Sequence, residues 1–270
     1  MKGAGKTYGL LSETSTIEET RNPYWMRNLP NDAAFLWLKL GWADLWRQPA
    51  LSLFYGIGVF VVSILSIWLM YIGGWEHYLF PAVAGFMIVA PVLAAGLYAK
   101  SKALESGGRG KEARVFMVRA DAGTHIIFTG LLLFLLLLLW MRAAVLVYAL
   151  FFGISPFPGF DAIVWMLFTT PTGWAMLVVG SFIGSLFAAL GFAVSVFSIP
   201  MLLDTRVDAL TAMGTSVALV WNNLRPMLIW GAVVLALFLF CVATAFVGLI
   251  IVFPLLGHAT WHAYRAVQRD

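Results

Sequence analysis

The segment THIIFTGLLLFLLLLLWMRAAVLVYAL, residues 124–150, contains a single charged residue, Arg142. An apolar stretch of about 20 residues is long enough to cross the hydrocarbon core of a bilayer. The whole chain is 61% hydrophobic and only 11% charged, whereas a soluble domain has about 25% charged residues. Because so few charges cannot cover a surface that faces water, the composition predicts that most of the surface faces lipid.

Stretches of the same apolar character lie on both sides of this segment. The expected spans are Leu51–Ile72, Leu79–Ala99, Thr124–Leu150, Gly173–Ile199, Met227–Ala243 and Ala245–Tyr264. The last two belong to one continuous apolar run that is about twice as long as a single span. We divide this run near Thr244.

The basic residues predict how the spans are oriented. Every Lys and Arg except Arg142 lies before the first span, between the second and third, between the fourth and fifth, or after the sixth. Since Lys and Arg are enriched in cytoplasmic loops, this pattern predicts six spans with both termini in the cytoplasm. We expect residues 1–30 to be a flexible cytoplasmic tail and residues 31–270 to form one six-helix membrane domain.

A weak internal repeat groups the spans into pairs. Each pair is preceded by a segment that we expect to lie in the membrane interface as an amphipathic helix. These segments are Asn31–Gln48, Glu112–Gly123 and Asp208–Asn223. Each pair also ends with a proline between apolar residues, at Pro91, Pro200 and Pro254. The predicted fold is therefore an all-α integral membrane protein with six transmembrane helices in three pseudo-repeated hairpins, accompanied by interfacial amphipathic helices.

Arg142 is the one basic residue that this topology does not explain. A charge inside the hydrocarbon core costs about 3 kcal/mol or more unless it is paired or reaches the interface. Asp161 and Glu76 are the acidic residues expected on the same outer side. We therefore expect an ion pair between Arg142 and one of these two carboxylates, with an anion or lipid-headgroup site as the alternative.

Three histidines are expected at a similar depth near the cytoplasmic side. His258 and His262 are four residues apart and share one face of the sixth span, and His125 opens the third span. Three imidazoles at one depth could bind haem or a metal ion. No carboxylate or thiolate accompanies them in a ligand spacing, so we expect interfacial hydrogen bonds there and no metal or other cofactor.

Prolines and small residues are expected to shape the helix packing. The three prolines remove backbone donors and free carbonyl groups, which predicts helix kinks, with a shared cavity between the hairpins as the alternative. The fourth span carries small residues on roughly one face, a pattern that allows close helix approach. They are Gly180, Gly184, Ala188 and Gly191.

Four stretches of the chain resemble one known family. They are Gly41–Pro49, Ala90–Tyr98, Pro200–Asp204 and Phe253–Tyr264. The family comprises predicted bacterial integral membrane proteins and is defined only as a domain of unknown function; some members carry a label that relates them to cytochrome c oxidase subunit I. The resemblance covers roughly residues 30 to 265. It implies a multi-pass protein of the bacterial inner membrane and supplies no activity.

The sequence favours a role without catalysis. It contains no HExxH, GxSxG or CxxC motif, so a zinc protease or a hydrolase triad has no support. We expect an accessory or assembly factor of a membrane complex, with a respiratory complex as one candidate, or a role in envelope lipid homeostasis. Expected partners are membrane lipids and a larger membrane-protein complex, but no nucleic acid, because the basic residues lie beside the spans.

Two other functions remain open. One is a small transporter or lipid-handling permease in which the proline steps and Arg142 line a cavity. The other is a haem- or metal-binding membrane protein that uses His125, His258 and His262 as ligands.

Overall fold

The computed structural model describes residues 25–27, 29–107, 120–153 and 157–268, and within these ranges all regular structure is helical. The helices are α2 (Ala33–Arg47), α3 (Pro49–Ile72), η1 (Glu76–Tyr78), α4 (Leu79–Leu93), α5 (Ala95–Glu105), α6 (Ala120–Phe152), α7 (Phe160–Thr169), α8 (Pro171–Ser195), α9 (Ser198–Asp204), α10 (Ala209–Asn222), α11 (Leu224–Ala243) and α12 (Leu249–Val267). The predicted all-α membrane class is therefore confirmed.

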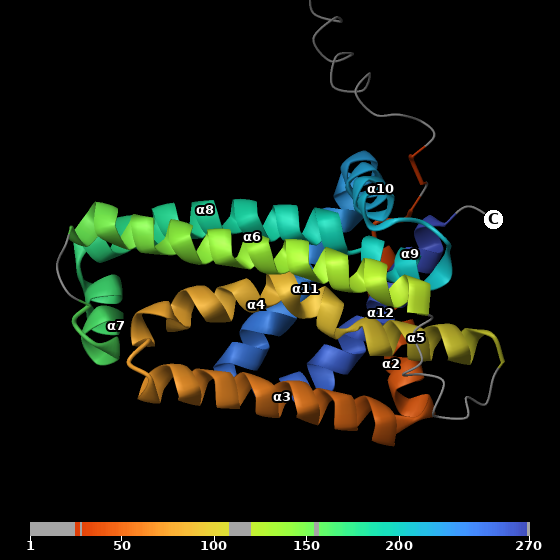
Figure 1. The fold of residues 1–270 in the computed structure, drawn as a ribbon, viewed down its shortest axis with the longest axis horizontal. Helices are drawn as coiled ribbons and strands as arrows, with labels where there is room; N and C mark the ends of the chain where they lie inside the picture. The colour runs from red at the N-terminus through yellow and green to blue at the C-terminus, as the bar shows by residue number, and fades with distance from the viewer. Residues whose placement is uncertain (1–24, 28, 108–119, 154–156, 269–270) are drawn as a thin grey trace, which may run out of the picture.

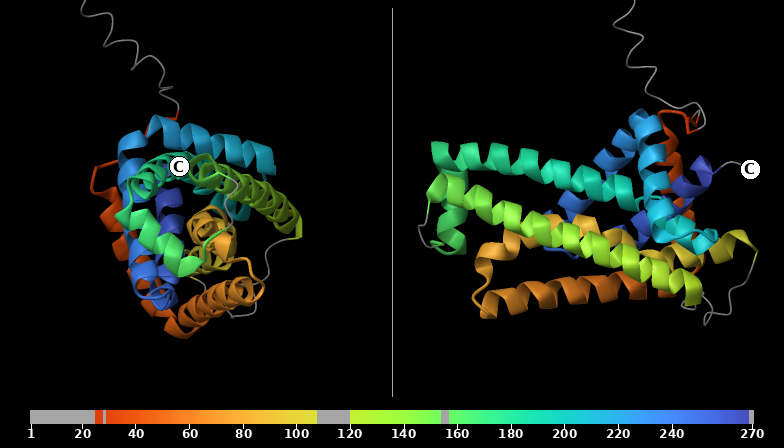
Figure 2. Two further views of the ribbon diagram at one scale, coloured as in Figure 1. Left: turned by 90° about the vertical axis from the view of Figure 1, so that its left-hand side faces the viewer. Right: turned by 45° about the horizontal axis from the view of Figure 1, so that its top comes forward.

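The long helices lie side by side along the longest axis of the molecule. Helices α3, α4, α6 and α8 run along this axis in Figure 1, with α7 at one end and α2, α9 and α10 at the other. The views in Figure 2 show α10 crossing the ends of the long helices at a steep angle. We call the two ends of the bundle the α7 end and the α10 end.

Five helical segments are long and apolar enough to cross a membrane. They are Pro49–Ile72, Glu76–Glu105, Ala122–Phe152, Pro171–Asp204 and Leu224–Ala243. These segments correspond to the first five expected spans, which makes the chain a multi-pass integral membrane protein. The sixth expected span corresponds to α12, which is not among them. Its C-terminal half carries His258, His262 and Arg265 and is largely buried by other helices.

Helix α12 forms the centre of the α10 end. It packs most extensively on α2, α3 and α5. The backbone of α2 comes so close at Gly41 that a Cβ there would lie 2.6 Å from the Ala259 nitrogen. On another side, a Cβ at Gly257 would lie 2.7 Å from Leu97 Cδ1 in α5. Glycine at these two crossings allows α2 and α5 to approach α12 closely.

Helix α3 meets α12 where Pro254 leaves a backbone carbonyl without its helical donor. Proline has no N–H, so the carbonyl of Ile250, four residues earlier, receives no bond from position 254. A Cβ at Gly56 would lie only 2.1 Å from this Ile250 oxygen. The Cα–H group of Gly56 therefore lies where an N–H donor would otherwise be. The Ile250 carbonyl thus forms part of the contact between α3 and α12.

The other two prolines lie beside breaks in long helical segments. Pro91 lies near the end of α4, and Ala94 separates α4 from α5. Pro200 lies in the first turn of α9, and Val196 and Phe197 separate that helix from α8. Because a proline cannot donate to the carbonyl four residues earlier, the Val196 carbonyl at the second break and the Met87 carbonyl before the first receive no bond from the proline.

Two of the three expected interfacial segments are helices at the α10 end, α2 and α10. Most of the third, Glu112–Gly123, lies outside the described residues. The outer face of helix α10 carries bulky apolar side chains: Leu210 is 63% and Trp221 57% exposed, whereas Ala212 and Ser216 are buried. A helix next to water normally shows the opposite pattern, so this outer face is suited to lipid.

The described end of the expected N-terminal tail packs against the helices. Asn223, between α10 and α11, accepts a hydrogen bond from the backbone N–H of Arg27 and donates one to the carbonyl of Trp25. The guanidinium of Arg27 donates to the carbonyl of Val267 at the end of α12. Residues 25–27 thus lie against the ends of α10, α11 and α12.

The turn between α11 and α12 has a strained conformation, and it lies at the expected position, near Thr244. The N–H of Phe246 donates to the Cys241 carbonyl and the N–H of Ala245 to the Val242 carbonyl, which is the Schellman arrangement of a helix C-terminus. This arrangement favours glycine at the position of Ala245, yet Ala245 has a φ of 50° and Phe246 a φ of 66°.

Replacing Ala245 with glycine should stabilise the protein. A non-glycine residue in the left-handed region costs about 1–2 kcal/mol, so we expect A245G to raise the free energy of unfolding by about 1 kcal/mol. Thermal unfolding in a mild detergent measures the change. The control is A243G in the last turn of α11, which should lower stability by about 0.5–1 kcal/mol. Equal effects of the two substitutions would contradict the strain.

The contact at Gly56 gives a second expectation. We expect G56A to destabilise the protein by about 1–3 kcal/mol because the new methyl group overlaps a backbone oxygen that has little room to move. The matched control is G58A, one half-turn further along α3, where a Cβ meets nothing within 4 Å. Thermal unfolding of both variants should show a loss for G56A and no loss for G58A. A tolerated G56A would show that α3 is not held against α12 there.

Candidate functional site

Six polar side chains from four helices form a cluster near the α10 end. They are Asp44 of α2, Ser52 of α3, Lys100 and Ser101 of α5, and His258 and His262 of α12. All but His262 are buried, and Lys100 is only 1% exposed. Burying a charge is costly unless hydrogen bonds and an opposite charge compensate for the lost water. We call these six residues the polar cluster.

The cationic end of the polar cluster is Lys100. Its Nζ donates to the Ser52 hydroxyl at 2.6 Å and to the backbone carbonyl of Gln48 at 2.8 Å. Gln48 joins α2 to α3, and Ser52 lies in the first turn of α3. Lys100 therefore holds the start of α3 against α5.

His258 lies at the centre of the polar cluster and uses both ring nitrogens. Its Nε2 lies 2.8 Å from the Ser52 hydroxyl, and its Nδ1 lies 2.8 Å from the Ser101 hydroxyl. The imidazole thus connects α12 to both α3 and α5. Because both nitrogens are engaged, neither is left to ligate a metal or haem iron.

The anionic end is Asp44. Its Oδ2 accepts a hydrogen bond from the Ser101 hydroxyl at 2.9 Å and lies 2.8 Å from Nε2 of His262, while Arg47 approaches Oδ1 at 3.6 Å. Burial opposes ionisation of this carboxyl, but the hydrogen bonds from His262 and Ser101 and the electrostatic attraction of His262 outweigh it. The pKa of Asp44 is therefore below its usual value.

A second set of polar contacts lies beside the polar cluster and joins α5, α9 and α12. Lys102 pairs with Asp204 at 2.8 Å, and Arg265 pairs with Glu105 at 3.0 Å. The hydroxyl of Tyr264 also donates to Asp204, at 3.2 Å. Tyr264 is buried, whereas the four charged side chains are more exposed than Lys100 and Asp44. These contacts attach short α9 to α5 and α12.

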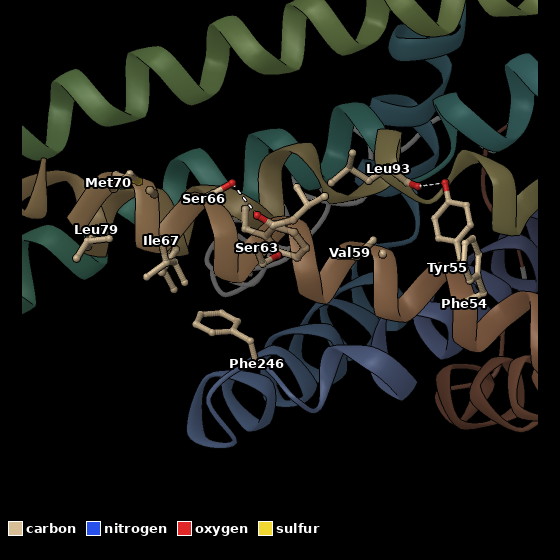
Figure 3. Close-up of a pocket in the computed structure, with 15 residues that line it drawn as sticks. Phe54, Tyr55, Val59, Ser63, Ser66, Ile67, Met70, Leu79, Leu93 and Phe246 are labelled. Carbon is tan, nitrogen blue, oxygen red and sulfur yellow. Dashed lines mark hydrogen bonds between the residues drawn. The ribbon is translucent and has the colours of Figure 1, made fainter. Parts of the chain in front are cut away.

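A groove of about 510 Å³ runs between α3 and α4. Figure 3 shows it along the length of α3, with Phe246 from the turn between α11 and α12 pointing toward the helix. Its lining is apolar apart from Ser63, Ser66 and Tyr55. Ser66 donates to the Val62 carbonyl of its own helix, and Tyr55 donates to the Leu93 carbonyl, so both of these hydroxyls are already satisfied.

Residues 79–204 match the model of a protein family described as "Predicted integral membrane protein (DUF2189)". The resemblance to a family of integral membrane proteins of unknown function is confirmed over this range, which begins with α4 and ends with α9. No curated protein and no solved structure matches the chain. The matched range contributes Lys100 and Ser101 to the polar cluster and the α4 wall to the groove.

The structure brings two of the three predicted histidines together but adds a carboxylate that the sequence analysis missed. His258 and His262 both belong to the polar cluster, whereas His125 lies apart from it on α6. No carboxylate accompanies the histidines in a ligand spacing along the sequence, but Asp44, which is 218 residues away from His262 in the chain, lies beside it in the fold. Within the described residues, no group of three or more His, Cys, Asp or Glu side chains could hold a metal ion.

The expected ion pair of Arg142 is not formed. Arg142 is exposed on α6, and none of the ion pairs that the described residues form includes it. Asp161 lies in the first turn of α7 and Glu76 in η1. The arginine side chain is instead directed to the surroundings of the bundle, and the alternative of an anion or lipid headgroup beside it stays a prediction.

The small residues of α8 pack against neighbouring helices of the same chain. A Cβ at Gly184 would lie 3.0 Å from the Trp140 ring of α6, and one at Gly191 would lie 3.4 Å from Ile88 of α4. At Gly180 the nearest neighbour is Val147 of α6, at 3.8 Å. The stripe therefore allows α8 to approach α6 and α4.

One alternative from the sequence predicts a cavity that all three prolines line. An inner cavity of about 110 Å³ is lined by Pro91 and Ala188, but by neither Pro200 nor Pro254. Pro200 lies in short α9, and Pro254 is buried within α12. The three proline steps therefore do not converge on one site.

The ionised state of Asp44 should make stability depend on pH. We expect D44N to cost about 1–3 kcal/mol at pH 7, because the new amide presents donors to neighbouring donors. The carboxyl has a lower pKa in the folded protein than its ordinary value of 3.8, so its stabilising contribution is complete above the unfolded-state pKa and is lost as the pH falls through the folded-state pKa.

Thermal unfolding of wild type and D44N between pH 7 and pH 3 tests this expectation. The difference in midpoint between the two proteins should shrink as the pH falls. A difference that stays constant across the range would show that Asp44 is not held as a carboxylate.

Proposed function

We propose that this protein is a non-enzymatic, multi-pass membrane protein that handles lipid, and that the groove between α3 and α4 holds an acyl chain. The groove is the observation that supports the proposal most directly. Its volume of about 510 Å³ lies within the range of about 300–1,000 Å³ that is common for ligand sites. Its lining residues belong mainly to two helices that are suited to cross a membrane.

The chemistry of the groove favours a flexible hydrocarbon chain. The hydroxyls of Ser66 and Tyr55 already donate to backbone carbonyls, so neither needs an acceptor from a polar ligand. A transmembrane helix is about 10 Å across and about 30 Å long, which is several times the volume of the groove. An acyl chain fits this space better than a partner helix does.

The lipid role includes a proposed topology. We infer six spans, with α12 as a sixth helix at the centre, and both termini on the cytoplasmic side of a bacterial inner membrane. Support comes from the position of the basic residues, because α2, α5, α9 and α10 and the end of α12 gather at the α10 end (Figure 1). Lys39, Lys102, Arg206, Arg225 and Arg265 lie on or beside these elements, as the positive-inside rule requires.

An accessory or assembly role in a larger complex is the competing proposal. It would need a partner helix over α3, the span with the smallest buried share among the five. The two proposals differ in what stays bound when the protein is extracted from the membrane: a lipid in one, a protein partner in the other. The experiment therefore identifies what is extracted with the protein.

Filling the groove should remove its lipid. We propose G58F, because Gly58 lines the groove and a Cβ there meets nothing within 4 Å. The measurement is native mass spectrometry of the protein released from its membrane in a mild detergent. We expect lipid adducts on the wild type and a loss of about tenfold or more in G58F, which corresponds to about 1.4 kcal/mol of binding free energy.

The matched control is V178F, which adds similar bulk at an exposed position of α8 away from the groove. Adducts should persist in this variant. Equal retention of lipid by both variants would contradict the groove as the site, and a stoichiometric protein partner on a lipid-free wild type would favour the accessory role instead.

A further inference from the structure

Between Lys100 and Asp44, the hydrogen bonds of the polar cluster point in one direction. A serine hydroxyl has a single proton, and that of Ser101 is donated to Asp44. The contact between Ser101 and Nδ1 of His258 must therefore be an N–H donated by the ring. At the other end, Lys100 has only donors and gives one to Ser52.

The remaining contact fixes the protonation state of His258. If Nε2 also carried a proton, Ser52 would receive two donors and its own proton would have no place in the chain. The ring would then also be a second cation beside Lys100. A neutral ring with its proton on Nδ1 accepts from Ser52 at Nε2, and every hydrogen bond of the chain is satisfied. This is the arrangement with no conflict between donors.

We propose that the residues from Lys100 to Asp44 form a proton-transfer chain through which the buried amine exchanges its proton with the carboxylate. The order is Lys100, Ser52, His258, Ser101, Asp44. Four protons move, each across one hydrogen bond. The amine proton passes to Ser52, and the Ser52 proton passes to Nε2 of His258. The Nδ1 proton of the ring passes to Ser101, and the Ser101 proton passes to Asp44.

This transfer conserves atoms and total charge and needs no other reactant. The ammonium becomes an amine, the carboxylate becomes a carboxylic acid, and the imidazole stays neutral while its proton changes from Nδ1 to Nε2. All donors then point the opposite way. Both charges vanish together, so the neutral state avoids the cost of two buried ions, whereas the charged state has the stronger hydrogen bonds. The chain thus has two alternative states that contain the same number of protons.

The surroundings determine where protons enter. Ionisable groups face the chain from three helices: Asp44 and Arg47 from α2, Lys100 from α5, and His258 and His262 from α12. Helix α3 contributes only the Ser52 hydroxyl and the start of its backbone.

The Lys100 end is closed, whereas the His262 side chain beside Asp44 is 18% exposed. Asp44 is therefore the end that communicates with the solvent. This inference does not depend on what the α3–α4 groove binds.

Hydrogen exchange at the His258 ring tests the transfer. The full chain, labelled with 15N-histidine, is placed in lipid nanodiscs, and H77Q and H125Q reduce the signals to His258 and His262. In wild type we expect a neutral His258 ring protonated at Nδ1, whose proton exchanges with deuterated water although the residue is buried. S101A interrupts the chain between the ring and Asp44 and should slow this exchange by about tenfold or more.

S52A removes the hydroxyl that delivers a proton to Nε2, and without that proton the ring cannot release the one on Nδ1, so S52A should slow exchange as S101A does. The matched control is S198A, because Ser198 is also a fully buried serine but bonds the Ser195 carbonyl outside the chain, and its exchange should stay as fast as in wild type. Wild-type exchange in S52A or S101A, or equal slowing in S198A, would overturn the proposal, as would an imidazolium or an Nε2-protonated ring in wild type. Thermal unfolding checks that the variants fold; if S101A does not fold, S101C keeps the volume with a weaker hydrogen-bonding group and should give an intermediate rate.

Discussion

The need to satisfy two opposite charges inside an apolar bundle determines how four helices are arranged. Lys100 and Asp44 are buried at opposite ends of one hydrogen-bonded chain. Removing a partner from such a network leaves a charge without compensation, which is much more costly than losing an exposed ion pair. The positions of Ser52, Ser101 and His258 relative to one another are therefore tightly constrained, and with them the rotation and depth of α2, α3, α5 and α12.

Such short hydrogen bonds require close helix packing, and the glycines at the crossings provide it. Gly41 brings α2 onto α12, Gly56 brings α3 onto α12, and Gly257 lets Leu97 of α5 approach. In lipid, close packing of this kind replaces much of the hydrophobic driving force that folds soluble proteins. Packing and polar contacts thus depend on each other. Without the glycines, the polar side chains could not come within hydrogen-bonding distance. Without those hydrogen bonds, α12 would bury polar groups that have no partner.

The sequence predicted those features that depend on local composition. The apolar stretches correspond to five candidate spans, the interfacial periodicity to α2 and α10, and the division near Thr244 to the turn between α11 and α12. The polar cluster could not be predicted in the same way, because a carboxylate in α2 and a histidine in α12 meet only through tertiary packing. A position just beyond an expected span also made Lys100 look like one more basic loop residue, although it is buried.

The ion pair predicted for Arg142 is not formed among the described residues, for a related reason. Charge counting identified the acidic residues on the same side of the membrane, but it contains no distances, and no ion pair of the described residues includes Arg142. Hydropathy likewise does not predict how deeply α12 is buried. The burial of α12 depends on the helices around it and cannot be predicted from the sequence of α12 alone.

Helix α3 connects the two features of the molecule that have functional interest. Its first turns are held by the Lys100 hydrogen bonds to Gln48 and Ser52 and by the contact at Gly56. Further along, its residues form one wall of the groove (Figure 3), and η1 joins its far end to α4. The start of α3 is held by polar contacts, whereas the part that lines the groove presents mainly apolar side chains. One helix therefore combines a fixed register at the polar cluster with an apolar wall in the membrane.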